Sequence, residues 1–175
     1  MSRLDGRRPR VYESWATPDI WAVPRWSTDD ELWGRAFAPL ATVESPAYEG
    51  VFLHRDFHLG NVLWLDSEIS GVVDWVETSW GPAHLDVAHA STSLAMLHGP
   101  DSASAFEDAY YEAAGRNCDP ADRYWNILDI VGFLPDPNKV LQPWRDTGIA
   151  FTDRTARARL EEHLRRCLDG ATAGR

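Results

Sequence analysis

Short apolar runs separated by turn residues mark one part of this chain. They stand at residues 51–53, 61–65 and 69–73, and Asp66-Ser67-Glu68 separates the last two. Apolar runs of this length that are bounded by turn residues are typical of β-strands. We therefore expect one strand at 51–53, followed by a small β-hairpin over residues 61–73.

The rest of the pattern has helical spacing. Thr28 and Glu31 have the spacing of a capping box, and Asp119-Pro120 combines a cap residue with a proline suited to the first helical position. The stretch from His84 to Leu97 is apolar on most faces, which predicts a central, buried helix. We expect helices over residues 28–38, 84–97, 101–115, 120–133 and 152–168. The predicted fold class is α+β, mostly helical with one small hairpin.

Composition supports one folded domain. The 175 residues include 44% hydrophobic residues and nine tryptophans, which is typical of a globular protein. Residues 1–26 are rich in Trp and Pro and predict an irregular segment, and residues 27–170 predict the domain itself. Cys118 and Cys167 lie far apart in the sequence, so we expect them to be reduced.

Charge and hydropathy limit the partners. The formal net charge of −10 argues against a nucleic-acid partner, because such binding depends on basic residues. No apolar run approaches the ~18–20 residues of a membrane helix, and the first dozen residues lack the apolar core of a secretory signal. We expect no membrane partner and a soluble, cytoplasmic protein.

The most informative segment is the loop between the first two expected strands. It contains His54-Arg55-Asp56 and, five residues after Asp56, Asn61; the hairpin then delivers a second aspartate, Asp74. In phosphoryl transfer one carboxylate accepts the proton of the attacking hydroxyl, while an amide oxygen and a second carboxylate bind magnesium. These residues therefore predict a phosphoryl-transfer site.

The spacing also carries a resemblance. The pattern H-x-D-x-H-x-x-N, followed by G-V-V-D-W at 71–75 and W-G-P-x-x-x-D at 80–86, resembles the aminoglycoside phosphotransferase family of small-molecule kinases over roughly residues 51–98. The resemblance implies the C-terminal lobe of a protein-kinase-like fold. It also implies transfer of the γ-phosphoryl group of ATP to a hydroxyl of a small molecule, with Mg²⁺ as cofactor.

Three residues carry the expected chemistry. Asp56 is the expected catalytic base, because a carboxylate near the acceptor hydroxyl orients it and accepts its proton. Asn61 and Asp74 are the expected magnesium ligands, because that ion prefers hard oxygen ligands.

Four neighbours are expected to support this loop. His54 and Arg55 are expected to be scaffold residues. His58 is left with two roles, a hydrogen bond to a phosphate or a brace within the loop. By resemblance, Asp86 accepts hydrogen bonds from the backbone of the catalytic loop, since a buried carboxylate without partners is costly.

A different chemistry remains open. His54, Asp56 and His58 alternate, so on an extended strand they share one face and can form a transition-metal site for hydrolysis. Further ligands for it are available from Asp74, Asp86 and His89. That interpretation gives no purpose to Asn61 or to the hairpin.

A kinase of this kind also needs groups that bind the nucleotide phosphates. Only 53 residues precede His54, Lys139 is the single lysine, and no G-x-G occurs. We therefore expect the N-terminal nucleotide-binding lobe to be absent from this chain. An alternative is a truncated or degenerate remnant that acts as a binding module or needs a second chain to supply that lobe. A further alternative is that Met1 lies inside a longer reading frame.

The acceptor is expected to be a small hydroxylated molecule. A cationic acceptor such as an aminocyclitol antibiotic is one option, and it would make the protein a resistance enzyme. An acidic surface suits such a substrate, and it equally suits ordinary solubility. The same two interpretations apply to four acidic residues after Gly99, namely Asp101, Glu107, Asp108 and Glu112.

Overall fold

A computed structural model describes residues 10–42 and 44–170 of the chain. In chain order its elements are η1 (Pro18–Ile20), α1 (Asp30–Thr42), β1 (Gly50–Leu53), η2 (Leu59–Asn61), β2 (Val62–Leu65), β3 (Glu68–Val72), η3 (Trp75–Glu77), β4 (Ser79–Pro82), α2 (His84–His98), α3 (Pro100–Ala114), α4 (Pro120–Gly132), η4 (Pro137–Val140), α5 (Gln142–Asp146) and α6 (Asp153–Asp169). This arrangement confirms the predicted α+β class.

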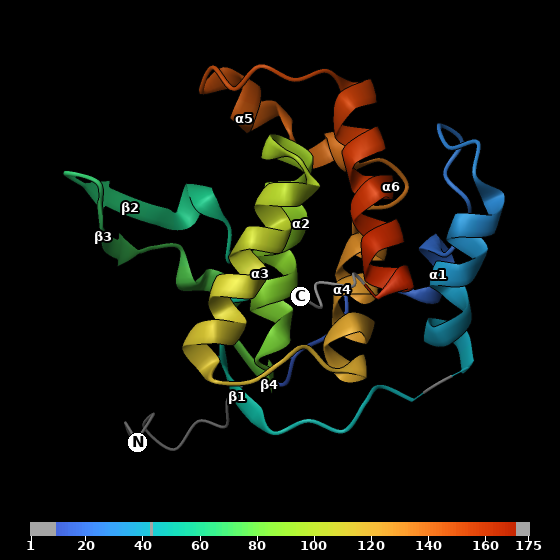
Figure 1. The fold of residues 1–175 in the computed structure, drawn as a ribbon, viewed down its shortest axis with the longest axis horizontal. Coiled ribbons are helices and arrows are strands. Elements are labelled where there is room, and N and C mark those ends of the chain that lie inside the picture. The colour runs from blue at the N-terminus through green and yellow to red at the C-terminus, as the bar shows by residue number, and fades with distance from the viewer. Residues whose placement is uncertain (1–9, 43, 171–175) are drawn as a thin grey trace.

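Helix α2 is the centre of the molecule. It packs against α3, α4 and α6, and nearly all of its side chains are buried (Figure 1). The helix can be buried on nearly all sides because it contains few charged residues. The helix ends at His98 and is capped by Gly99, whose φ of 104° is unfavourable for other residues. The prediction of a buried helix here is confirmed.

Two antiparallel sheets of two strands each lie in the described residues. Strands β2 and β3 form the predicted hairpin, and Asp66 and Ser67 make its turn with φ of 49° and 69°. Two consecutive positive φ values match the twist of a two-residue hairpin turn. This hairpin projects away from the helices (Figure 1).

The second sheet joins segments that the sequence pattern did not connect. Strand β1 pairs with β4, so that Leu53 lies opposite Ser79. The N-terminal segment adds a parallel bridge from Val11 to Trp80 on β4. The chain that leads into the loop at 54–60 is therefore held near the start of α2.

Most helix boundaries agree with the predictions, and the differences have local causes. The cap of α1 is Asp29 and not Thr28, because Asp29 Oδ1 accepts a hydrogen bond from the amide of Leu32 at 3.0 Å. Pro39 lies within the last turn of α1. The predicted capping of α4 by Asp119 is present as a full capping box. The short elements η4 and α5 were not predicted, because their prolines suggested only chain breaks.

None of the helices within residues 10–42 and 44–170 has both the length and the apolar character that a bilayer crossing requires. The predicted division at residue 27 stays a prediction, and the part of the predicted irregular segment before residue 10 lies outside the described residues.

Candidate active site at the loop between β1 and β2

Asp86 fixes the start of the loop. Its two carboxylate oxygens accept hydrogen bonds from the backbone amides of His54 and Arg55, both at 2.7 Å. The backbone of Arg55 has a φ of 75°, a strained value for a residue with a side chain. A carboxylate that binds two consecutive amides stabilises that turn, and this is the hydrogen bonding expected of Asp86.

The side chain of Arg55 points to the N-terminal segment. Its Nη2 donates to the carbonyl of Glu13 at 3.0 Å, and its guanidinium lies 4.4 Å from the ring centroid of Trp15. Arg55 is buried in the process. Arg55 therefore connects residues 13–15 to the loop, as a scaffold residue does.

His54 links the loop to the end of the hairpin. Its Nδ1 accepts from the amide of Asp56 at 3.3 Å, so the proton resides on Nε2, which donates to the carbonyl of Val73 at 2.8 Å. The ring of Trp75 lies 4.6 Å from that of His54, centroid to centroid. Both chain neighbours of Asp74 are thus held against His54.

Asn61 joins Asp56 to the hairpin. Its Nδ2 donates to the backbone carbonyl oxygen of Asp56 at 2.8 Å and to Asp56 Oδ2 at 3.2 Å. The backbone carbonyl of Asn61 accepts a hydrogen bond from the amide of Val73 at 2.9 Å. Because the amide nitrogen of Asn61 faces Asp56, Oδ1 is the atom that can bind a cation.

Asp74 follows Val73 directly and has left-handed backbone angles, φ 62° and ψ 53°. Its side chain is exposed. The two bonds of Val73, one to Asn61 and one to His54, keep the backbone of Asp74 beside the loop. A carboxylate and an amide oxygen suit Mg²⁺, which prefers hard oxygen ligands and retains several waters. The residues present therefore fit that ion.

Two histidines face the carboxylate of Asp56. His58 Nε2 lies 3.6 Å and His89 Nε2 lies 3.4 Å from Asp56 Oδ1. These two rings hold the pKa of Asp56 well below its usual range and outweigh the opposite effect of partial burial. Asp56 is therefore a carboxylate at neutral pH, the form that can receive a proton.

His89 itself lies between two carboxylates. Its Nδ1 is 3.0 Å from Oδ1 of Asp129, a buried residue of α4. Burial alone lowers the pKa of His89, but the charges and hydrogen bonds of Asp129 and Asp56 outweigh it and raise that pKa to about 9. Asp129, His89 and Asp56 thus form a line of alternating charge that runs from α4 to the loop.

His58 also braces the loop. Its Nδ1 accepts from the amide of Gly60 at 3.0 Å, which leaves the proton on Nε2, the atom that faces Asp56. The ring packs edge-on against Trp144 with the centroids 5.5 Å apart. Of the two roles left open for His58, these contacts favour the brace.

A cavity of about 610 Å³ opens beside Asp56. Its lining includes Trp15, His89, Lys139 and Trp144. The size suits a small molecule, since ligand pockets span ~300–1,000 Å³. Among the residues that the structure describes, Asp56 is the one carboxylate in this lining.

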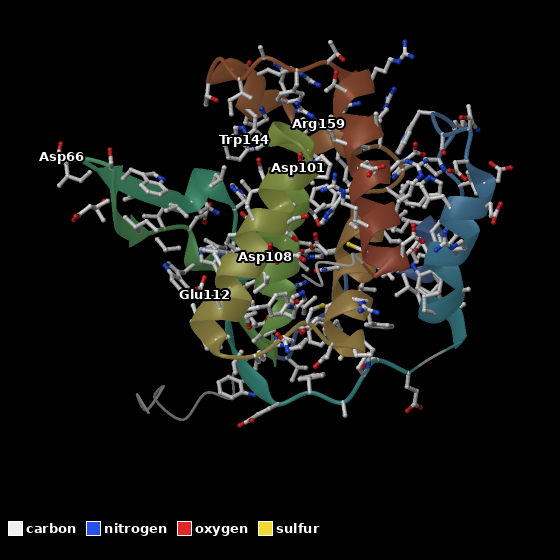
Figure 2. The ribbon with its side chains drawn as sticks, in the orientation of Figure 1. Asp66, Asp101, Asp108, Glu112, Trp144 and Arg159 are labelled. Carbon is white, nitrogen blue, oxygen red and sulfur yellow. The ribbon has the colours of Figure 1, made fainter. Side chains whose placement is uncertain are left out.

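The acidic residues of α3 belong elsewhere. Glu107, Asp108 and Glu112 line a different cavity of about 780 Å³, which does not include Asp56. In Figure 2, Asp101, Asp108 and Glu112 follow α3, whereas Trp144 extends from α5. These acidic side chains are therefore not part of the cavity at Asp56.

The transition-metal alternative loses its geometric basis. His54, Asp56 and His58 do not lie on an extended strand, because Arg55 turns the backbone between them. Within the part of the chain that the structure describes, no group of three or more His, Cys, Asp and Glu side chains is arranged to hold a metal ion. The metallohydrolase interpretation is thus not supported.

The sequence did not predict the roles that several residues have at this site. His89 was considered only as a possible metal ligand, and Asp129 and Trp144 were not considered at all. One signal was present for His89: it follows Asp86 by three residues, so both face the same side of α2. The other two come from segments far along the chain.

A comparison with known protein families found a match. A family model described as the phosphotransferase enzyme family matches residues 3–123, which is more than half of the chain and includes all seven residues singled out around the loop. The match extends beyond the stretch of residues 51–98 in which the sequence motifs lie. No curated protein and no solved structure matched the chain.

Proposed function

Because this chain belongs to the phosphotransferase enzyme family, we propose that it transfers the γ-phosphoryl group of ATP to a hydroxyl group of a small molecule. The acceptor occupies the cavity beside Asp56. The bond that forms joins the acceptor oxygen to the γ-phosphorus, and the bond that breaks joins that phosphorus to the oxygen bridging it to the β-phosphate. The hydroxyl proton passes to Asp56 and then to solvent, and ADP leaves.

Atom by atom, Oδ2 of Asp56 is the better proton acceptor. Oδ1 already faces two imidazole nitrogens, whereas Oδ2 has one donor, the amide nitrogen of Asn61. Oδ2 therefore keeps a lone pair for the acceptor hydroxyl. The low pKa of Asp56 makes it a weak base, so its main contribution is to orient the hydroxyl while the new bond forms.

Asn61 Oδ1 and the carboxylate of Asp74 are the residues that would hold Mg²⁺. The ion supplies positive charge that neutralises the phosphate oxygens during transfer. The residues around it have a separate task, because His54 and Val73 keep the backbone of Asp74 beside Asn61.

One observation carries the proposal: an ionised aspartate stands at the wall of a cavity and is bonded to an asparagine that has a free amide oxygen. The test uses the full chain, Mg²⁺ and γ-labelled ATP with a panel of hydroxylated small molecules, and follows phosphorylated products by mass spectrometry. We expect a product that disappears when EDTA removes the metal. Hydrolysis of ATP with no labelled acceptor across the panel would contradict the transfer.

A second candidate function has its own observation. The projecting hairpin exposes apolar side chains that are 47–67% accessible, namely Leu63, Trp64, Leu65 and Ile69. Exposed apolar groups that lie together mark interaction sites. With no G-x-G in this sequence, the chain is in this alternative weakly active or inactive alone, and a second chain that binds the nucleotide covers the hairpin.

The melting temperature distinguishes these two candidates. A chain that binds nucleotide by itself is stabilised by it, with the shift growing as Mg²⁺–ATP rises above its dissociation constant. An unchanged melting temperature at millimolar Mg²⁺–ATP favours the second candidate, and a shift that saturates favours an enzyme complete in one chain.

A further inference from the structure

The cavity beside Asp56 has an unusual lining for a site that would take a sugar-like polycation. Its walls are mainly apolar, with Met96 from α2, Leu134 and Leu141 from the chain after α4, and the rings of Trp15 and Trp144. Pockets for polar, multiply hydroxylated ligands need a polar group for each polar atom that they desolvate. This lining offers few such groups, so it suits a ligand with an apolar body.

Aromatic side chains are held at the walls by their own contacts. Trp15 lies edge-on to His89 with centroids 5.3 Å apart, and Arg55 covers its ring. Phe133 stacks on His89 at 5.6 Å with an interplanar angle of 15°. Trp144 meets His58. Rings fixed in advance cost little entropy when they bind a flat or cyclic ligand.

The only lysine of the chain reaches this cavity. Lys139 Nζ donates to the carbonyls of Gly132 at 3.2 Å and Leu134 at 2.9 Å, which uses two of its three hydrogens. In the described residues no carboxylate lies within ion-pair distance of Lys139. Its positive charge is therefore available to a ligand and repels a cationic one.

The carboxylates near the cavity already face histidine side chains. Asp56 faces His58 and His89, and Asp129 lies behind His89 and outside the lining. A polycation would find one carboxylate, already paired, and a lysine. An anionic or neutral molecule would find an unpaired ammonium group and apolar walls.

We propose that this cavity selects a hydroxylated acceptor with an apolar, ring-containing body and no positive charge, and that Lys139 binds a carboxylate or carbonyl group of that acceptor. The inference rests on the proposed function in one respect, the reaction at Asp56. Binding selectivity can be measured without that reaction.

Three probes with the same ring provide the test: 4-(hydroxymethyl)benzoate, benzyl alcohol and 4-(aminomethyl)benzyl alcohol. Their dissociation constants for the full chain are measured by ligand-observed NMR without nucleotide. The Coulomb energy between Lys139 and a unit charge a few ångströms away is large at a partly buried site. We therefore expect the carboxylate probe to bind at least ~5-fold more tightly than the amine probe. Equal affinities, or tighter binding of the amine, overturn the proposal.

Matched variants locate the effect. Lys139→Gln should remove the preference for the carboxylate probe, and Lys139→Arg should retain it. Trp144→Ala should weaken all three probes, whereas Trp64→Ala, on the projecting hairpin, should leave them unchanged; circular dichroism confirms the fold of each variant. A carboxylate preference that persists in Lys139→Gln contradicts the role of Lys139.

Chemical protection separates acceptor from donor. Acetylation of Lys139, the only lysine, is followed by mass spectrometry and should be slowed by 4-(hydroxymethyl)benzoate. If Mg²⁺–ATP alone protects Lys139 equally well, the lysine serves the phosphate donor and the proposal fails. If the binding preference holds but no hydroxyl is ever phosphorylated, the proposed function fails and this pocket assignment stands. If the protein phosphorylates a polycation such as kanamycin and does not bind the ring probes, the proposed function stands and this pocket assignment fails.

Discussion

His89 Nε2 lies 3.4 Å from Asp56 Oδ1, although the two residues come from different elements and are separated by the whole hairpin. The second ring nitrogen of His89 is bound to Asp129. A histidine that is charged between two carboxylates keeps Asp56 ionised and limits its rotation. The loop at 54–60 is thereby coupled electrostatically to α2 and α4.

The first prediction concerns the pH dependence of stability. The pKa of His89 is raised from 6.5 to about 9 in the folded protein, so its contribution to stability is fully present below pH 6.5 and is lost as the pH rises through about 9. Urea unfolding at several pH values should show a falling free energy of unfolding over that range. His89→Gln should flatten this decline, and parallel profiles for the two proteins would show that His89 is not protonated in the folded state.

Asp86 supports a second prediction, on stability. Asp86→Ala leaves two backbone amides without their acceptor, and we expect it to lower the free energy of unfolding by roughly 2–4 kcal/mol, since hydrogen bonds to charged groups are worth more than neutral ones. Asp86→Asn keeps one acceptor oxygen and should cost about half as much. Asp108→Ala on the surface of α3 is the control for a lost aspartate, and an equal loss in that variant would refute the role of Asp86.

Gly60 gives a third prediction, because a side chain there has no room. A Cβ at Gly60 would lie 2.9 Å from His58 Cε1 and 3.1 Å from the end of the Trp144 ring. Gly60→Ala should therefore displace the His58 ring and lower kcat by ~3–10-fold, in line with the sensitivity of catalysis to small misplacements, with little loss of stability. Gly71→Ala in β3 has nothing within 4 Å of the new Cβ and should behave like wild type. If both variants keep full kcat, the position of His58 does not matter.

The fourth prediction concerns Lys139. Burial lowers its pKa from the usual 10.5, because the charged form is less well solvated. Reductive methylation with ¹³C-formaldehyde labels this single lysine and the chain terminus, so its titration can be followed by NMR in one resolved signal. The midpoint should lie below that of a free dimethylated lysine measured in the same buffer. A midpoint at or above the free value would place the ammonium group in bulk water.

Local signals in the sequence predicted local structure well. Asp119 caps α4 through bonds to residues three positions away, and the turn at Asp66-Ser67 depends on two adjacent backbone conformations. Interactions between residues this close in the sequence are determined by those residues themselves. The bonds of Asp86 were likewise expected, because the family resemblance covers Asp86 and the loop together.

Other features depend on how distant segments meet. The pairing of β1 with β4 and the contact between His89 and Asp129 join residues about 30 to 40 positions apart, and no periodicity in the sequence specifies them. Lys139 was noted only as lying far downstream of the loop. It reaches the cavity because the chain turns back after α4, which the prolines of that segment did not reveal.

The central claim is tested most directly by the rate of phosphoryl transfer in two matched variants, Asp56→Asn and Asp66→Asn. Both replace one aspartate by its amide, and Asp66, at the tip of the hairpin (Figure 2), has a backbone conformation that asparagine accepts. We expect Asp56→Asn to reduce transfer to the acceptor hydroxyl by at least ~100-fold, the usual scale for a lost general base, while Asp66→Asn stays at the wild-type rate. Transfer that proceeds equally fast in Asp56→Asn, with the fold intact, would contradict the assignment of Asp56 as the residue that receives the proton.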